Sequence, residues 1–115
     1  MIEEATDGNF DALVAKYPRL LVMAFNPWCD PCTAAKPIFK AVAAANELYG
    51  VQAAGLWAER APAACDKLKV EATPTFLAVR AGRVVGRVEG LNVRKLQALA
   101  RQLRATPKRR KKEPE

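Results

Sequence analysis

Residues 20–32 of this 115-residue chain read LLVMAFNPWCDPC, and this stretch decides the fold. Its first six residues are apolar without polar alternation, which is typical of a strand covered on both faces inside a parallel or mixed sheet. Beyond the second cysteine, apolar residues recur at steps of four, three and four, which predicts a long helix that ends before Gly50. The apolar residues at these steps are Ile38, Val42, Ala45 and Tyr49.

The elements on either side of this stretch alternate between strands and helices. Phe10 begins a helical pattern that Asp7 is expected to cap and that Pro18 ends. Residues 51–58 predict a strand and residues 62–68 a short helix. Two β-prone runs, 75–79 and 84–89, flank a turn at Ala81-Gly82 and predict a hairpin. An edge strand at residues 2–5 and a helix from 93 to 103 complete the pattern, which indicates an α/β sandwich with a central mixed sheet of four to five strands and helices on both faces.

Composition and charge limit the classes of protein to which the chain can belong. Half of its residues are hydrophobic, which is enough for the core of one domain and excludes global disorder. Lys and Arg number 19 and Asp and Glu 12, giving a net charge of +7. Residues 1–66 carry −3 and residues 67–115 carry +10. The longest compact apolar run, 20–25, is far too short to cross a bilayer, and the acidic start differs from a secretory signal, so we expect a cytoplasmic protein without membrane contact.

The three cysteines indicate redox chemistry. An odd number without any histidine does not form a disulfide framework. Cys29 and Cys32 are two residues apart and can close a small disulfide ring at the start of the helix, where free N–H groups and the helix dipole favour a thiolate at Cys29. The alternative for this pair is half of a zinc site, which lacks two ligands because only Cys65 remains. No metal is therefore expected, and Cys65 is interpreted as a small buried hydrophobe, with a regulatory thiol as the alternative.

The chain resembles the thioredoxin family over about residues 2–105. The motif Trp28-Cys29-Asp30-Pro31-Cys32 follows a buried strand as the active site of that family does. The other matches are Pro37, the segment Thr73-Pro74-Thr75, Gly82 and Gly90. The resemblance implies a thioredoxin fold in residues 1–106, with residues 107–115 expected to form a basic, disordered tail.

What the resemblance implies for function is a thiol–disulfide oxidoreductase that reduces disulfides in proteins. Cys29 would attack the substrate disulfide and Cys32 would resolve the mixed disulfide. Disulfide-containing proteins would be the substrates and an NADPH-dependent thioredoxin reductase the reductant, with no bound cofactor and a monomeric chain. The residues expected to contact substrate are Trp28, Thr73, a cis Pro74 and Gly90. Asp30 and Pro31, between the cysteines, are the residues expected to tune the pKa of Cys29.

Two departures from the family pattern concern proton transfer and charge. Met23 stands where thioredoxins generally have a buried Asp, and Gly55 where they have its companion Lys. We interpret Met23 as a core residue, with water taking the proton of Cys32; a slower resolving step is the alternative. Asp30 replaces the usual glycine, and its carboxylate opposes a second negative charge on Cys29.

The basic end of the chain supports a second hypothesis, that of an accessory subunit in which the cysteines are secondary. The segment Lys108-Arg109-Arg110-Lys111-Lys112 has three open interpretations. It could solubilise the chain, contact nucleic acid or an acidic partner, or direct nuclear import. An intact pair of cysteines favours the oxidoreductase over the accessory subunit, since a protein used only for binding needs neither thiol.

Overall fold

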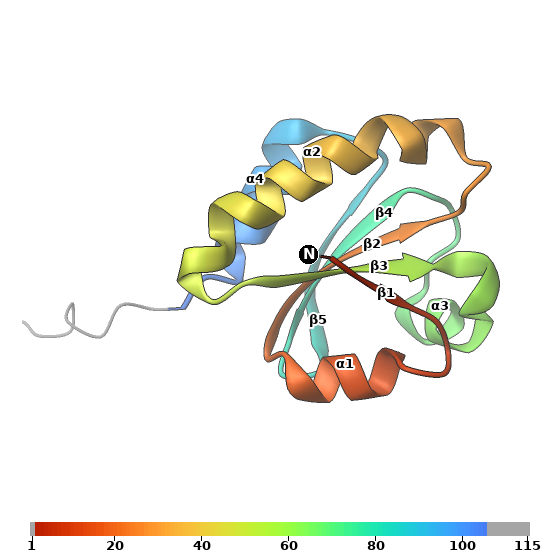
Figure 1. Cartoon of the computed structure of the whole chain (residues 1–115), viewed down its shortest axis with the longest axis horizontal. Helices are drawn as coiled ribbons and strands as arrows, with labels where there is room; N and C mark the ends of the chain where they lie inside the picture. Colours follow the sequence, from red (N-terminus) through yellow and green to blue (C-terminus); the bar gives the residue numbers. More distant parts are fainter. Residues whose placement is uncertain (1, 106–115) are drawn as a thin grey trace, which may run out of the picture.

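The computed structural model describes residues 2–105, which form a five-stranded mixed sheet between two layers of helices (Figure 1). The strands are β1 (Glu3–Ala5), β2 (Arg19–Phe25), β3 (Gln52–Trp57), β4 (Thr75–Arg80) and β5 (Arg83–Glu89), in the order β1-β3-β2-β4-β5. β3 runs parallel to both β1 and β2, whereas β4 pairs antiparallel with β2 and β5. The predicted α/β class and mixed sheet are confirmed.

Helices lie on both faces of the sheet, as expected, although most of the edge strand β5 stays exposed. They are α1 (Phe10–Lys16), α2 (Asp30–Asn46), α3 (Pro62–Leu68) and α4 (Val93–Gln102), with 3₁₀ turns η1 (Glu47–Tyr49) and η2 (Ala58–Arg60). α2 and α4 cover one face of the sheet and α1 and α3 the other (Figure 1). Side chains of α2 and α4 share one apolar core, and those of α1 and α3 share the other. Residues 107–115, predicted to be a disordered tail, lie outside the described residues.

The central position of β2 explains its unbroken apolar sequence. Alternate side chains of a strand point to opposite faces, so Leu21, Met23 and Phe25 enter the α2–α4 core while the residues between them enter the α1–α3 core. All six residues from 20 to 25 are at most 8% exposed. Each large apolar side chain buried in this way stabilises the fold by about 1.5–3 kcal/mol. β2 is therefore a rigid, buried strand that positions the start of α2.

Two local predictions are wrong, and each has a physical reason. Asp7 does not cap α1, whose N-cap is Asn9. The carboxylate of Asp7 instead accepts hydrogen bonds from Ala63 N and Ala64 N, and so satisfies free amides at the start of α3. The α-helix after the cysteines ends at Asn46 and a 3₁₀ turn continues to Tyr49, where the ring is half exposed. The buried face of α2 is instead Cys32, Ala35, Phe39, Val42, Ala43 and Asn46.

The turn at Ala81-Gly82 and the end of η1 at Gly50 agree with the predictions from the sequence. Ala81 and Gly82 have φ values of +50° and +82°, and two successive left-handed residues form the tight turn that joins β4 to β5. Gly50, with φ of +83°, ends η1 as predicted. Within residues 2–105 no helix combines the length and apolar character needed to cross a membrane.

Candidate active site

The two cysteines lie at the start of α2, shortly after β2 ends, and a disulfide joins them. Cys29 is the N-cap of α2 and Cys32 is in its first turn; their Cα atoms are 5.2 Å apart. Cys29 is half-buried, whereas Cys32 is 3% exposed. Because the sulfur of Cys32 is enclosed by protein, an incoming disulfide can reach Cys29 far more easily.

The start of α2 offers Cys29 electrostatic support. The backbone N–H of Cys32 donates to Cys29 Sγ over 3.2 Å, which makes the sulfur the acceptor that caps the helix. A thiolate formed here on reduction would keep this bond and gain the positive end of the helix dipole. Such an arrangement favours the ionised, nucleophilic form of a cysteine.

A loop before β4 forms the other wall of the site. The carbonyl oxygen of Thr73 is 3.6 Å from Cys29 Sγ, and the Thr73–Pro74 bond is cis, as predicted. Gly90 N donates to Pro74 O over 2.9 Å, with Gly90 at a φ of +77°. Thr75, 1% exposed, donates its hydroxyl to Ala72 O over 2.6 Å. The loop is therefore fixed on both sides of Pro74.

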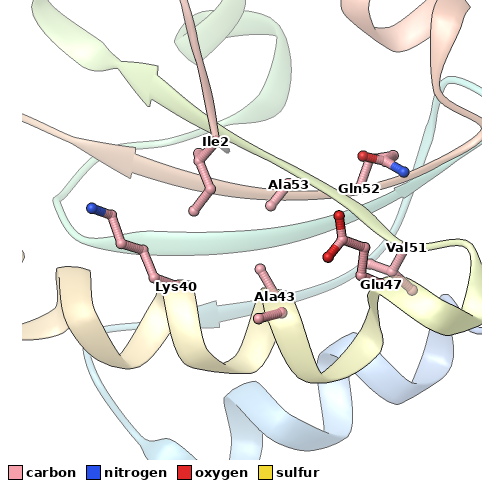
Figure 2. A pocket seen from close by; sticks show the side chains of 8 residues that line it. Ile2, Lys40, Ala43, Glu47, Val51, Gln52 and Ala53 are labelled. Atoms are coloured by element: carbon pink, nitrogen blue, oxygen red, sulfur yellow. The ribbon is translucent and has the colours of Figure 1, made fainter.

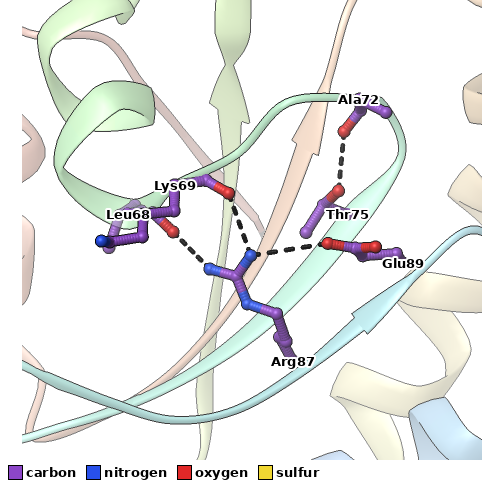
Figure 3. A network of polar contacts seen from close by, with 6 residues as sticks. All are labelled: Leu68, Lys69, Ala72, Thr75, Arg87 and Glu89. Atoms are coloured by element: carbon purple, nitrogen blue, oxygen red, sulfur yellow. Dashed lines mark hydrogen bonds and ion pairs between the residues drawn. The ribbon is translucent and has the colours of Figure 1, made fainter.

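Arg87 ties β5 to the end of α3 (Figure 3). Its guanidinium donates to the carbonyls of Leu68 and, over 3.0 Å, of Lys69, and it lies 3.6 Å from the carboxylate of Glu89. Leu68 ends α3, so two carbonyls that the helix leaves without partners are satisfied by a side chain from the sheet. Lys69 has a left-handed φ of +58°, and these bonds stabilise that turn.

A pocket of about 370 Å³ opens next to Thr73, the residue whose carbonyl faces Cys29 Sγ. Trp28 and Thr73 border it, and Trp28 is 63% exposed. Its lining includes two carboxylates, Glu59 and Glu71, and no Lys or Arg. The amide oxygen of Asn26 accepts from Glu59 N over 3.0 Å, which holds the loop after β3 against the loop that carries Trp28.

Cys65 of α3 borders the same pocket, and it is the one free cysteine of the described residues. Burial raises the pKa of its thiol above the ordinary value, and the charge of Asp7 raises it further. A neutral thiol in an apolar setting is a poor nucleophile. The prediction that Cys65 is a small buried hydrophobe is confirmed.

The positions where thioredoxins have a buried Asp and its companion Lys are apolar in this chain, whereas the pocket next to Thr73 is lined by two carboxylates. Met23 is 2% exposed and lies opposite Gly55 of β3 in the sheet register. A Cβ on Gly55 would come within 3.1 Å of the Phe25 ring, so the aromatic side chain occupies the space that a larger residue would need. The interpretation of Met23 as a core residue is confirmed, and the two positions hold no ionisable side chain.

A separate hollow of 330 Å³ lies between α2 and the strands β1 and β3 (Figure 2). Lys40 of α2 and Glu47 of η1 point toward it, and its other walls are mostly apolar. It shares no lining residue with the pocket beside Cys29. We therefore assign the chemistry to the disulfide and the pocket beside it.

The structure gathers the residues singled out in the sequence, with two exceptions. The carbonyl of Thr73 faces Cys29, Trp28 borders the adjacent pocket together with Thr73, and Gly90 holds Pro74 through a backbone hydrogen bond. Asp30 and Pro31, however, are exposed to solvent on the first turn of α2. Asn26, Glu59 and Glu71 were missed, since their roles depend on loops that only folding brings together.

Comparisons with known proteins agree with this geometry. A sequence model of the thioredoxin family matches residues 1–105. Thioredoxin-1 of Caenorhabditis elegans is 26% identical over 85 residues, which cover 72% of each chain. Chloroplastic thioredoxin Y1 of Arabidopsis thaliana is 31% identical over 88 residues, which cover 76% of this chain and 51% of that protein. The chain thus spans between half and three quarters of the length of these two relatives.

Solved structures show the same fold. The oxidised form of mitochondrial thioredoxin 3 from Saccharomyces cerevisiae superposes with a TM-score of 0.80 at 23% identity, covering 89% of this chain and 95% of that one. The reduced thioredoxin of Schistosoma mansoni gives 0.78 at 26% identity, with 89% and 97% covered.

Proposed function

The chain belongs to the thioredoxin family and is a thiol–disulfide oxidoreductase, and we propose that it works as a reductant of protein disulfides through Cys29 and Cys32. The observation that carries this proposal is the position of Cys29. Its sulfur caps α2 through the N–H of Cys32 and faces the carbonyl of Thr73 beside an open pocket.

In the first step, the thiolate of Cys29 attacks one sulfur of the substrate disulfide. A bond forms between Cys29 Sγ and that sulfur, the substrate S–S bond breaks, and the second substrate sulfur leaves as a thiolate that takes a proton from water. An extended substrate segment can pair with the backbone of Thr73, because the peptide groups beside Pro74 face the sulfur.

In the second step, Cys32 loses its proton and attacks Cys29 Sγ. The mixed disulfide breaks, the remaining substrate sulfur leaves as a thiol, and the Cys29–Cys32 disulfide closes. Two electrons pass from the protein to the substrate in the complete cycle. Since Met23 and Gly55 carry no ionisable group, water takes the proton from Cys32.

Members of the thioredoxin family act on disulfide-containing substrates and are reduced again by a thioredoxin reductase. For this chain we propose an NADPH-dependent reductase as the electron donor. The predicted cytoplasmic location and monomeric state, and contact with nucleic acid or an acidic partner through residues 108–112, stay predictions.

The charge of the pocket beside Cys29 points to the class of substrate. Glu59 and Glu71 are exposed carboxylates on its walls, and neither forms an ion pair with a described residue. A Lys or Arg next to the reacting cysteine of a substrate would meet both charges, whereas an acidic residue would be repelled. We expect preferential reduction of disulfides flanked by basic residues.

Peptide disulfides that differ only in one flanking residue, Lys or Glu, would test this selectivity. The wild-type protein should reduce the Lys peptide several-fold faster at low salt, and Glu59→Gln together with Glu71→Gln should remove most of the difference. Glu47→Gln is the matched control, because Glu47 lies in η1, beyond the end of α2 that is distant from Cys29. Equal rates for both peptides with the wild-type protein would contradict the assignment.

The roles of the two thiols can be separated by trapping. Cys32→Ser keeps the attacking thiol but lacks the one that resolves the mixed disulfide, so incubation with a disulfide protein should give a covalent 1:1 adduct visible by mass spectrometry. Adding a small thiol reductant should release the substrate. A Cys29→Ser protein, used as the control, should give no adduct because Cys32 is buried. An adduct with Cys29→Ser but not with Cys32→Ser would reverse the two roles.

A further inference from the structure

A third pocket, of 250 Å³, lies between the C-terminal half of α2 and the C-terminal part of α4 with the residues that follow it. Ala41, Val42 and Ala45 form its α2 wall together with Asn46. The opposite wall is polar and consists of Gln97 and Arg101 of α4 together with Arg104, which follows the end of that helix at Gln102. Gln97 and Arg101 are four residues apart, so they lie on one face of α4. The pocket shares no residue with the one beside the disulfide.

Arg104 is held in one orientation by its neighbours. Its Nε donates to Asn46 Oδ1 over 2.7 Å, and its guanidinium carbon lies 4.0 Å from the centre of the Tyr49 ring. Asn46 is itself 4% exposed and is fixed by a bond of 2.8 Å from its Nδ2 to Val42 O. A side chain that normally samples many rotamers is thereby prepared for binding.

The two terminal nitrogens of the Arg104 guanidinium have no hydrogen-bond partner within residues 2–105. The bond to Asn46 uses Nε, while the terminal nitrogens of Arg104 donate to none of the described side chains or carbonyls. Neither Arg104 nor Arg101 lies within ion-pair distance of a described carboxylate. No acidic residue lines the pocket. Two positive charges therefore share a pocket without an opposing charge.

We propose that this pocket binds a phosphoryl group. The terminal N–H groups of Arg104 form a planar fork that matches two oxygens of a phosphate, and Arg101 and the amide of Gln97 lie on the same wall to meet the others. The methyl groups of Ala41, Val42 and Ala45 form an apolar wall beside it. That wall suits the organic part of a small phosphate ester, while free phosphate would use only the polar wall.

Titration of the full-length, oxidised protein with inorganic phosphate and with phenyl phosphate, at constant ionic strength set by NaCl, would test the site. NMR resonances of Arg104 Nε and of the Gln97 amide should shift and saturate with at least one of the two. Tighter binding of phenyl phosphate identifies an ester as the ligand, and equal binding identifies free phosphate. The absence of a saturable shift with both compounds would overturn the proposal.

Variants separate a built site from general attraction by a basic protein. Arg104→Lys keeps the charge but loses the fork and the bond to Asn46, and should weaken binding at least tenfold. Arg101→Gln should weaken it several-fold without disturbing the fold, because the Arg101 side chain is exposed. The control, Arg83→Gln, removes an exposed charge from β5 and should bind as the wild type does. Equal weakening by Arg83→Gln and Arg104→Lys would show non-specific charge attraction and overturn the site.

Discussion

The two ends of α2 carry two polar sites built in opposite ways. At the N-terminal end, the helix itself is the functional element, because its free N–H groups and dipole act on Cys29. At the C-terminal end the helix serves only as a wall, and the side chain of Asn46 holds Arg104, which follows the end of α4. One end presents a sulfur beside two carboxylates, and the other presents two guanidinium groups.

This difference shows why only one end was recognisable in the sequence. The chemistry of the N-terminal end depends on residues that are neighbours in the chain, Trp28 to Cys32, and on a fixed helix start. The C-terminal pair, Asn46 and Arg104, is separated by 58 positions and depends on the packing of α4 against α2. A sequence motif can therefore predict the site at the N-terminal end of α2, but it cannot predict the contact between Asn46 and Arg104.

The largest effect is expected at the N-terminal end. Cys29→Ser removes the nucleophile, and reduction of a protein disulfide such as insulin should fall to less than a few per cent of the wild-type rate. The buried Cys32 cannot replace Cys29, since it is 3% exposed. A turbidity assay with dithiothreitol as electron donor measures this rate. Cys65→Ser is the matched control and should retain full activity; substantial activity in Cys29→Ser would exclude Cys29 as the attacking group.

Cys65 offers a second contrast between thiols of the same molecule. When Cys29 and Cys32 form their disulfide, Cys65 is the remaining free thiol. Burial raises the pKa of Cys65, and the negative charge of Asp7 raises it further. Its alkylation by iodoacetamide at pH 8 should be more than tenfold slower than that of a small free thiol, because little thiolate is present. Denaturant should restore the ordinary rate. Fast alkylation of the folded, oxidised protein would contradict burial of this thiol.

The same shift in pKa has a consequence for stability. The unfolded thiol ionises at its ordinary pKa, while the folded thiol stays protonated to higher pH. The folded state therefore loses stability as the pH rises from the ordinary pKa toward the raised one, and the contribution is complete below that range. Urea unfolding between pH 7 and 10 should show a steeper decline for the wild type than for Cys65→Ala.

At the C-terminal end we expect an effect on stability and none on catalysis. Asn46→Ala removes the hydrogen bonds to Val42 O and from Arg104, and leaves the arginine without its acceptor. Loss of about 1–3 kcal/mol in the free energy of unfolding should follow. Urea denaturation measures it, with the exposed Gln97→Ala as control within about 0.5 kcal/mol of wild type. A drop in reductase activity of the folded variant would show that the two ends are coupled.

Much of the fold could be predicted from the sequence because its signals are local. The six apolar residues of β2 predicted a strand buried on both faces, and Ala81-Gly82 predicted the hairpin turn. Pairing of Asp7 with the start of α3 could not be predicted, since 56 positions separate it from Ala63. The burial of Phe39 on α2 was missed as well, and the exposure of Tyr49 was missed because the chain changes to a 3₁₀ turn after Asn46.

The smallest effect is expected from Asp30, which lies at the N-terminal end of α2 yet points into water. Its carboxylate is close in sequence to Cys29, and a negative charge there disfavours a thiolate, but the side chain is exposed and solvent and salt screen it. Asp30→Asn should therefore move the pH dependence of Cys29 alkylation in the reduced protein toward acid by a few tenths of a pH unit, with a rate change of less than about threefold near neutral pH. The shift should shrink further in 1 M NaCl, whereas the contribution of the Cys32 N–H bond, which lies inside the protein, should not. A shift of more than one pH unit, or one toward base, would mean that Asp30 acts through the backbone of the helix start and not through its charge.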